Sequence, residues 1–105
     1  MRRVVFRPHA RQDLDDIAEF IALDNLDRAI SFVDELGQAC RHRADFPLSG
    51  RDRSDMAAGL RSFAHKNYVI YYFVLAGGNG IEIAHVIHGA RDHETIMRDE
   101  DESLG

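Results

Sequence analysis

Histidines are the residues of this sequence with the widest capacity for chemistry, because imidazole binds metal ions and exchanges protons near neutral pH. The chain carries six of them, and His85, His88 and His93 are the closest set. Residues three apart on a strand face opposite sides of a sheet, so His85 and His88 are expected to diverge. No cysteine and few carboxylates accompany them. The pattern therefore predicts neither a metal site nor a bound cofactor.

Carboxylates are concentrated near the start of the chain, at Asp13, Asp15, Asp16 and Glu19. Such a cluster could bind magnesium through its oxygens. A solvated helix face, with its acids near the positive N-terminal end of the helix, is the simpler interpretation. The single cysteine, Cys40, excludes an internal disulfide, and its place on an apolar helical stripe predicts a packing role rather than a reactive thiol.

The spacing of apolar residues predicts the elements that hold these side chains. Residues 2–7 are expected to form a short strand that ends at a proline. An apolar stripe at i, i+3, i+4 and i+7 predicts a helix over 9–23. A second stripe predicts a helix that follows Asp24-Asn25 and ends by about residue 44, so the two helices should form an antiparallel hairpin. Residues 51–55 are polar and read as a loop.

The residue pattern of the second half of the sequence is typical of a strand meander. Strands are expected over 60–65, 68–75 and 81–88, and the middle one is apolar on both faces, so it should be central and covered on both sides. The glycine-rich segment 77–80 precedes a strand rather than a helix, which indicates a hairpin turn and not a phosphate-binding loop. Residues 93–98 are expected to add one helical turn. The order predicts a single α+β domain.

Composition limits the class of protein. The chain has 105 residues, of which 45% are apolar and 30% charged, so it can bury a core and is not disordered. The net charge is −5, and setting aside the four acids at 99–102 leaves about −1, which argues against non-specific binding to nucleic acid. We expect a folded domain over 1–98, an acidic tail over 99–105, no membrane span or secretory signal, and a cytoplasmic location.

An ordered set of short motifs runs along nearly the whole domain, from about residue 4 to 96. The members are Phe6 with Pro8 and Ala10; Asp13-Leu14 with Ile17; Phe20-Ile21; Asn25, Ala29 and Phe32; Pro47 and Gly50-Arg51; Gly59-Leu60-Arg61-Ser62-Phe63; Tyr68-Val69-Ile70-Tyr71-Tyr72; and Val86-Ile87-His88-Gly89-Ala90-Arg91-Asp92. With this set the sequence resembles the ParE toxins of type II toxin–antitoxin modules, within the RelE/ParE superfamily. Arg7 departs from the pattern, since relatives often carry serine before the proline.

The resemblance implies a toxin, concerned with plasmid or chromosome maintenance, that a ParD-like antitoxin neutralises in a hetero-oligomer. It implies inhibition of DNA gyrase by direct binding, with DNA contacted only through the antitoxin. RelE-type relatives instead cut messenger RNA on the ribosome, using lysines, arginines and a tyrosine. Those positions fall near Leu60, Ser62, Val69 and Met97 here, and only Arg91 matches, so we expect no catalytic residues of that type. Proton transfer by His65, His88 or His93 keeps the ribonuclease as an alternative; a degenerate toxin that only binds its antitoxin is another.

The resemblance also implies a surface for the antitoxin. Arg61 and Arg91 lie in matching motifs at the predicted sheet edge, where they could pair with acids of the chain itself or with acids of an antitoxin tail. Phe20, Ile21 and Phe32 widen the helical stripes beyond what one core face needs, so they are the expected apolar anchors. We therefore expect an antitoxin tail to cover the helical hairpin as a helix and to add a strand at the sheet edge.

Overall fold

A computed structural model describes the backbone from residue 2 to residue 104 and the side chains of residues 2–98. The elements follow one another as β1 (Arg3–Phe6), α1 (Pro8–Ala22), α2 (Leu26–Asp45), β2 (Arg51–Asp52), β3 (Arg61–His65), β4 (Tyr68–Val74), β5 (Gly80–His88) and α3 (His93–Leu104). Short 3-10 turns stand at Pro47–Ser49 and Ala76–Gly78. This is the α+β domain that the sequence predicts.

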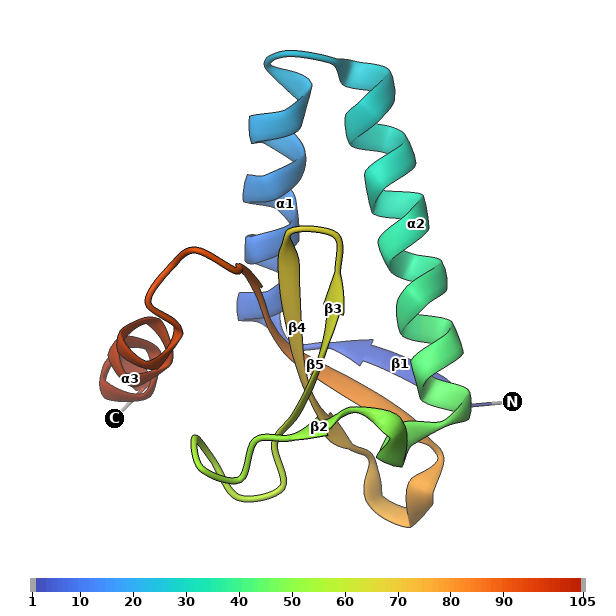
Figure 1. Ribbon diagram of the computed structural model, residues 1–105, viewed down its shortest axis with the longest axis vertical. Helices are drawn as coiled ribbons and strands as arrows, with labels where there is room; N and C mark the ends of the chain where they lie inside the picture. The colour runs from blue at the N-terminus through green and yellow to red at the C-terminus, as the bar shows by residue number, and fades with distance from the viewer. Residues whose placement is uncertain (1, 105) are drawn as a thin grey trace.

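Helices α1 and α2 form the expected antiparallel hairpin. Pro8 occupies the start of α1, where a missing N–H costs nothing, and the Asn25 side chain accepts a hydrogen bond from the Arg28 N–H at the start of α2 (3.0 Å). Figure 1 shows the two helices side by side, with their linked ends projecting beyond the sheet. The part of the hairpin away from its linked tip therefore packs on the sheet.

The sheet has five strands in the order β1-β5-β4-β3-β2. Strand β1 runs parallel to β5, and every other pair is antiparallel. Gly80 sits where β1 meets β5 with a φ of 133°, and a Cβ there would collide with the main-chain carbonyl of Arg3. Only glycine allows β1 and β5 to approach each other this closely at this point.

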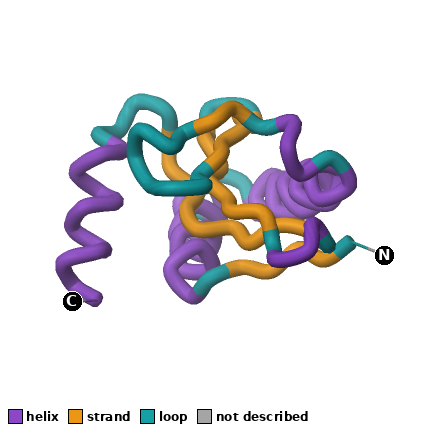
Figure 2. Tube along the Cα trace, turned by 90° about the horizontal axis from the view of Figure 1, so that it is seen from below, coloured by secondary structure: helices purple, strands orange, loops and turns teal. Residues whose placement is uncertain are grey.

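Both faces of the sheet are covered, as the apolar β4 predicts. On one face the hairpin packs over a core that includes Phe32, Leu36 and Ile70. On the other face a smaller cluster around Leu60, Tyr71 and Ile87 is covered by the segment after β2 and by α3, through Met56, Ile96 and Met97. Figure 2 shows α3 at the side of the molecule, away from α2.

Two local expectations need correction. The polar segment at 51–55 was expected to be a loop, but Arg51 and Asp52 pair with β3, because the strand edge there offers unpaired backbone groups. The single turn expected at 93–98 is instead a helix through Leu104, started by Asp92, whose carboxylate accepts from the Thr95 N–H (3.2 Å) and hydroxyl (2.8 Å).

Strand β5 contains a register shift. Tyr71 pairs with His85 and Tyr72 with Ile83, so Ala84 has no partner on β4. Ile83 and Val86, three residues apart, consequently pack in the same core cluster, which strict alternation does not allow. Beyond the bulge the pairing is regular from Tyr71–His85 to Tyr68–His88, so His85 and His88 face opposite sides of the sheet, as expected.

Acidic residues 99–102 belong to α3 in their backbone, but their side chains lie outside the described residues. Along the part of the chain that the structure describes, none of the helices is both long enough and apolar enough to cross a bilayer.

Candidate functional site

The outer side of the hairpin carries an apolar surface, which we call the hairpin face. Its four large side chains are Phe20, Leu23, Leu26 and Ile30, exposed by 72%, 88%, 64% and 55%. Leu26 and Ile30 line a groove of about 380 Å³ between the two helices, together with the smaller apolar residues Ala18, Ala22, Ala29 and Val33. Phe20 and Leu23 line a neighbouring hollow that shares Ala22 with this groove. Exposed apolar surface grouped in this way is typical of a site for a protein partner.

The three predicted anchors have different positions. Phe20 is on the hairpin face, and Ile21 is half-buried against the core. Phe32 is 2% exposed and packs against the rings of Tyr68 and His65, so it is a core residue and not a docking anchor. It points inward because α2 turns its Phe32–Leu36–Cys40 side toward the sheet. Leu26 and Ile30, whose stripe position was visible in the sequence, point outward instead.

Arg61 is occupied within the chain. Its Nη1 donates to the main-chain carbonyls of Leu48 (3.1 Å) and Gly50 (2.9 Å), in place of the carboxylates proposed for it. The same segment is held from the other side by Tyr72, whose hydroxyl donates to Pro47 O (2.7 Å) and accepts from the Gly50 N–H (3.0 Å). Arg61 therefore fixes the turn between α2 and β2.

Arg91 is exposed and lies in the loop after β5. It lines a pocket of about 310 Å³ together with Asp16, Phe20, Tyr68 and His88. Arg91 and Phe20 thus line the same pocket, at the border of the hairpin face. Arg61 and Arg91 do not converge, since Arg61 is level with Tyr72 while His88, three residues before Arg91, is level with Tyr68 at the other end of β4.

The predicted histidine set is not brought together as a ligand cluster. His93 Nε2 lies 2.9 Å from the His88 carbonyl oxygen and His93 Nδ1 lies 2.7 Å from the Tyr71 hydroxyl. Because a carbonyl only accepts, Nε2 carries the proton and Nδ1 accepts from Tyr71. His65 instead approaches Glu35 (3.8 Å). Of the three candidates for proton transfer, His88 and His93 thus contact each other through the His88 carbonyl, and His65 contacts Glu35.

One member of the acidic cluster departs from the expectation of a solvated face. Asp15, Asp16 and Glu19 are exposed, as expected. Asp13 instead turns toward β5, where its carboxylate accepts a hydrogen bond from the Val86 N–H (3.0 Å). Burial raises the pKa of Asp13 above its ordinary value, and the hydrogen bond from Val86 opposes that shift.

The positions equivalent to a RelE-type centre are apolar or buried. Leu60 and Ser62 are 2% and 5% exposed, and Val69 and Met97 pack against the smaller core cluster. At these four positions the fold uses the side chains to cover the sheet.

Cys40 is fully buried in the main core, as its stripe position predicts. Burial raises the pKa of its thiol to about 12. The thiolate form that nucleophilic chemistry requires is therefore disfavoured.

Comparisons with known proteins agree with this geometry. The family model described as "ParE toxin of type II toxin-antitoxin system, parDE" matches residues 4–93. Among solved structures, a chain of the chromosomal ParDE toxin–antitoxin system from P. aeruginosa superposes with a TM-score of 0.68 at 18% identity, covering 84% of this chain and 96% of that one. No curated protein matches the chain in sequence.

Proposed function

This chain belongs to the ParE toxin family of type II toxin–antitoxin systems, and from that premise we propose that it inhibits DNA gyrase by direct binding in the cytoplasm and is neutralised by a ParD-like antitoxin. The observation that carries the antitoxin part is the hairpin face with its exposed Phe20, Leu23, Leu26 and Ile30. A folded domain of this size gains nothing from exposing such a surface in isolation.

The hairpin face has the shape and chemistry for an amphipathic helix. The groove between α1 and α2 accepts apolar side chains spaced one helical turn apart. Arg91, beside Phe20 at the border of this face, can pair with an acid that follows the apolar anchors. Binding of this kind orders a disordered antitoxin tail only when it meets the toxin, which leaves the free antitoxin open to proteolysis.

The proposal that this chain inhibits gyrase rests on its family and on the side chains at the RelE-type positions. Of the five positions that carry RelE-type catalysis, four hold Leu60, Ser62, Val69 and Met97, and only Arg91 matches. Two of these four are buried and the other two pack in a core cluster, so they supply neither a clamp of cations for a phosphate nor an acid and a base. Inhibition by binding needs no such groups.

Two measurements test the proposal. Purified protein should inhibit supercoiling by gyrase, and equimolar ParD-like antitoxin from the same operon should restore it. Induced expression in cells should cause growth arrest with filamentation and an SOS response. Rapid loss of translation with cleaved messages would instead support the RelE-type ribonuclease, and a fully viable culture would support a degenerate toxin that only binds its antitoxin.

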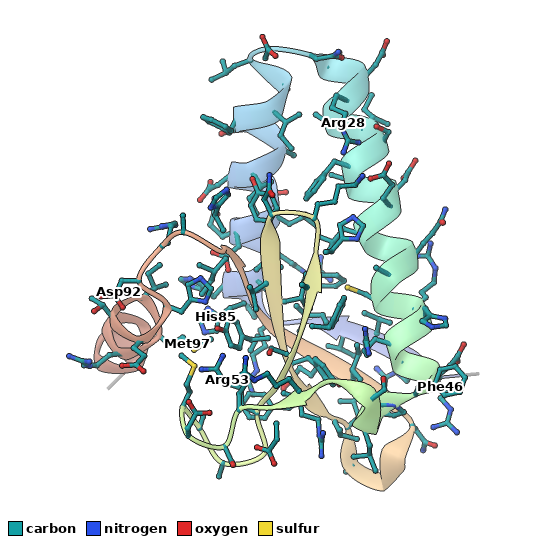
Figure 3. All side chains as sticks on the ribbon, in the orientation of Figure 1. Arg28, Phe46, Arg53, His85, Asp92 and Met97 are labelled. Atoms are coloured by element: carbon teal, nitrogen blue, oxygen red, sulfur yellow. The ribbon has the colours of Figure 1, made fainter. Side chains whose placement is uncertain are left out.

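The antitoxin surface is tested separately with Phe20→Asp, which places a charge on the hairpin face. We expect this variant to remain folded and to escape neutralisation by the antitoxin. Phe46→Asp is the matched control, because Phe46 is also exposed (58%) but lies at the end of α2 remote from the hairpin tip, as Figure 3 shows. Equal neutralisation of both variants would place the antitoxin elsewhere.

A further inference from the structure

Two histidines and one carboxylate meet where the start of α1 crosses β5. His9 and Asp13 are one helical turn apart on α1, so their side chains leave the helix on the same side. His85 comes from β5 and is 7% exposed. One ligand atom from each of these three residues lies within 4.8 Å of the others. Figure 3 shows His85 beside the first turns of α1.

The fold holds two of these side chains in place before any ligand arrives. Strand β1 ends opposite Ile83, so within the described part of the chain no strand pairs with that edge of β5 from residue 84 onward. Asp13 takes the neighbour's place there, and one of its oxygens, Oδ2, accepts from the Val86 N–H (3.0 Å). The bulge at Ala84 sets the direction of His85, which approaches the same oxygen to 4.0 Å. Such outer contacts orient metal ligands in known sites.

The spacing matches a small first-row metal ion. Zinc binds imidazole nitrogen and carboxylate oxygen at about 2.0–2.2 Å, so neighbouring ligand atoms of a tetrahedral site are about 3.3–3.5 Å apart. His9 Nε2 lies 3.4 Å from Asp13 Oδ1. His85 Nδ1 lies 4.0 Å from the other oxygen, Asp13 Oδ2, so coordination by one Asp13 oxygen needs the carboxylate to turn or a ring to shift. His9, with 41% of its side chain exposed, can adjust by rotating about its side-chain bonds.

From this geometry we propose that His9, Asp13 and His85 form a binding site for Zn²⁺, with the fourth position open to water or to a side chain of a partner. The ligand set is two imidazoles and one carboxylate, which suits zinc better than magnesium, because magnesium prefers oxygen ligands. The site does not depend on the gyrase or antitoxin proposals. Its role is to fasten the first turns of α1 to the uncovered half of the β5 edge.

The charges around the site are nearly balanced without an ion. Asp13 is influenced by the negative charge of Asp16 and by the positive charges of Arg91 and of His9 when that ring is protonated. A divalent cation would offset the cost of keeping the Asp13 carboxylate half-buried, and protons would compete with it for the imidazole nitrogens. Zinc affinity should therefore fall as the solution is made acidic.

Titration of the full-length, chelator-stripped protein with Zn²⁺ in a calorimeter tests the proposal. We expect binding of one ion per chain, a rise of several degrees in the melting temperature, and no comparable effect of Mg²⁺. With Co²⁺ as a spectroscopic substitute, the intense visible absorption of a four-coordinate site should appear.

The variants separate this site from adventitious binding at surface histidines. His9→Ala changes a partly exposed side chain and should lower zinc affinity at least tenfold and abolish the thermal shift. His85→Asn should also lower zinc affinity and abolish the thermal shift. Because His85 is buried, this substitution could prevent folding, and the result for His9→Ala then tests the site by itself. His42→Ala is the matched control, because His42 is exposed on α2 beside Phe46 and should leave binding unchanged. Equal affinity in wild type and His9→Ala, or no 1:1 binding at all, would overturn the assignment.

Discussion

Asp13 in α1 takes the place of a missing strand neighbour for Val86 in β5. Its Oδ2 accepts the Val86 N–H at 3.0 Å, across 73 positions of sequence, just beyond the point where β1 stops pairing with β5. A backbone N–H at a half-buried strand edge needs an acceptor, and this carboxylate is the one that the fold supplies. The contact ties the start of the hairpin to β5.

Two substitutions of Asp13 should distinguish the contribution of its hydrogen bond to stability from the contribution of its charge. Asp13→Asn keeps an acceptor for the Val86 N–H, whereas Asp13→Ala leaves that N–H unsatisfied and should lower the free energy of unfolding by about 1–3 kcal/mol. Urea denaturation in the presence of a chelator measures both variants. If Asp13→Asn loses as much stability as Asp13→Ala, the hydrogen bond does not act as described.

The same carboxyl group predicts a pH dependence. Burial raises the pKa of folded Asp13 above 3.8, so the folded state holds the proton more tightly than the unfolded chain does. The Asp13 contribution to stability is therefore greatest at pH below 3.8 and is lost as the pH rises through the folded pKa. Asp13→Asn lacks this dependence, so its stability relative to wild type should increase from acidic to neutral pH. A constant difference across that range would contradict the prediction.

The hairpin face should contain residues that dominate antitoxin binding. Phe20→Ala removes a ring that is 72% exposed, so stability should change little, while buried aromatic anchors of interfaces cost about 2 kcal/mol or more on truncation, or roughly thirty-fold in Kd. Calorimetric titration with the purified ParD-like antitoxin measures the change. Phe46→Ala, at the far end of α2, should bind within two-fold of wild type. A similar small change for Phe20→Ala would argue against the hairpin face.

The two arginines of the motif set should give opposite results. Arg61→Ala removes bonds to the Leu48 and Gly50 carbonyls and should cost about 1.5–3 kcal/mol of stability. Arg91→Ala changes an exposed residue, so stability should stay within about 0.5 kcal/mol of wild type. If Arg91 forms a buried pair with an antitoxin acid, its loss should weaken binding by about 2–5 kcal/mol. Urea denaturation and antitoxin titration of both variants distinguish a role in stability from a role in binding. Loss of stability in Arg91→Ala with loss of binding alone in Arg61→Ala would refute the two assignments.

Cys40 should be unreactive toward thiol reagents in the folded protein. Its thiol is fully buried and burial raises its pKa to about 12, so a disulfide reagent should react only as fast as the chain opens. Addition of urea above the unfolding midpoint should expose one thiol per chain at once. Rapid stoichiometric reaction of the native protein would show that α2 does not cover this residue.

Local patterns in the sequence determined the elements. The stripe of Leu14, Ile17 and Ile21 is readable because a helix repeats every 3.6 residues, and the run Tyr68–Val74 is apolar on both faces because both are covered. The position of Cys40 in the core followed from the same periodicity. Each of these properties depends on residues close together in the chain.

The sites depended on contacts between residues far apart, which no local pattern contains. Phe20 and Phe32 both widen an apolar stripe, but packing of the hairpin on the sheet buried Phe32 and left Phe20 exposed. Arg61 met carbonyls of a turn 11 and 13 positions away. His85 joined His9 and Asp13 because β1 is too short to cover β5 and because a one-residue bulge alters the alternation of the strand. Strand length and register are properties of the whole sheet, so only the tertiary structure could decide them.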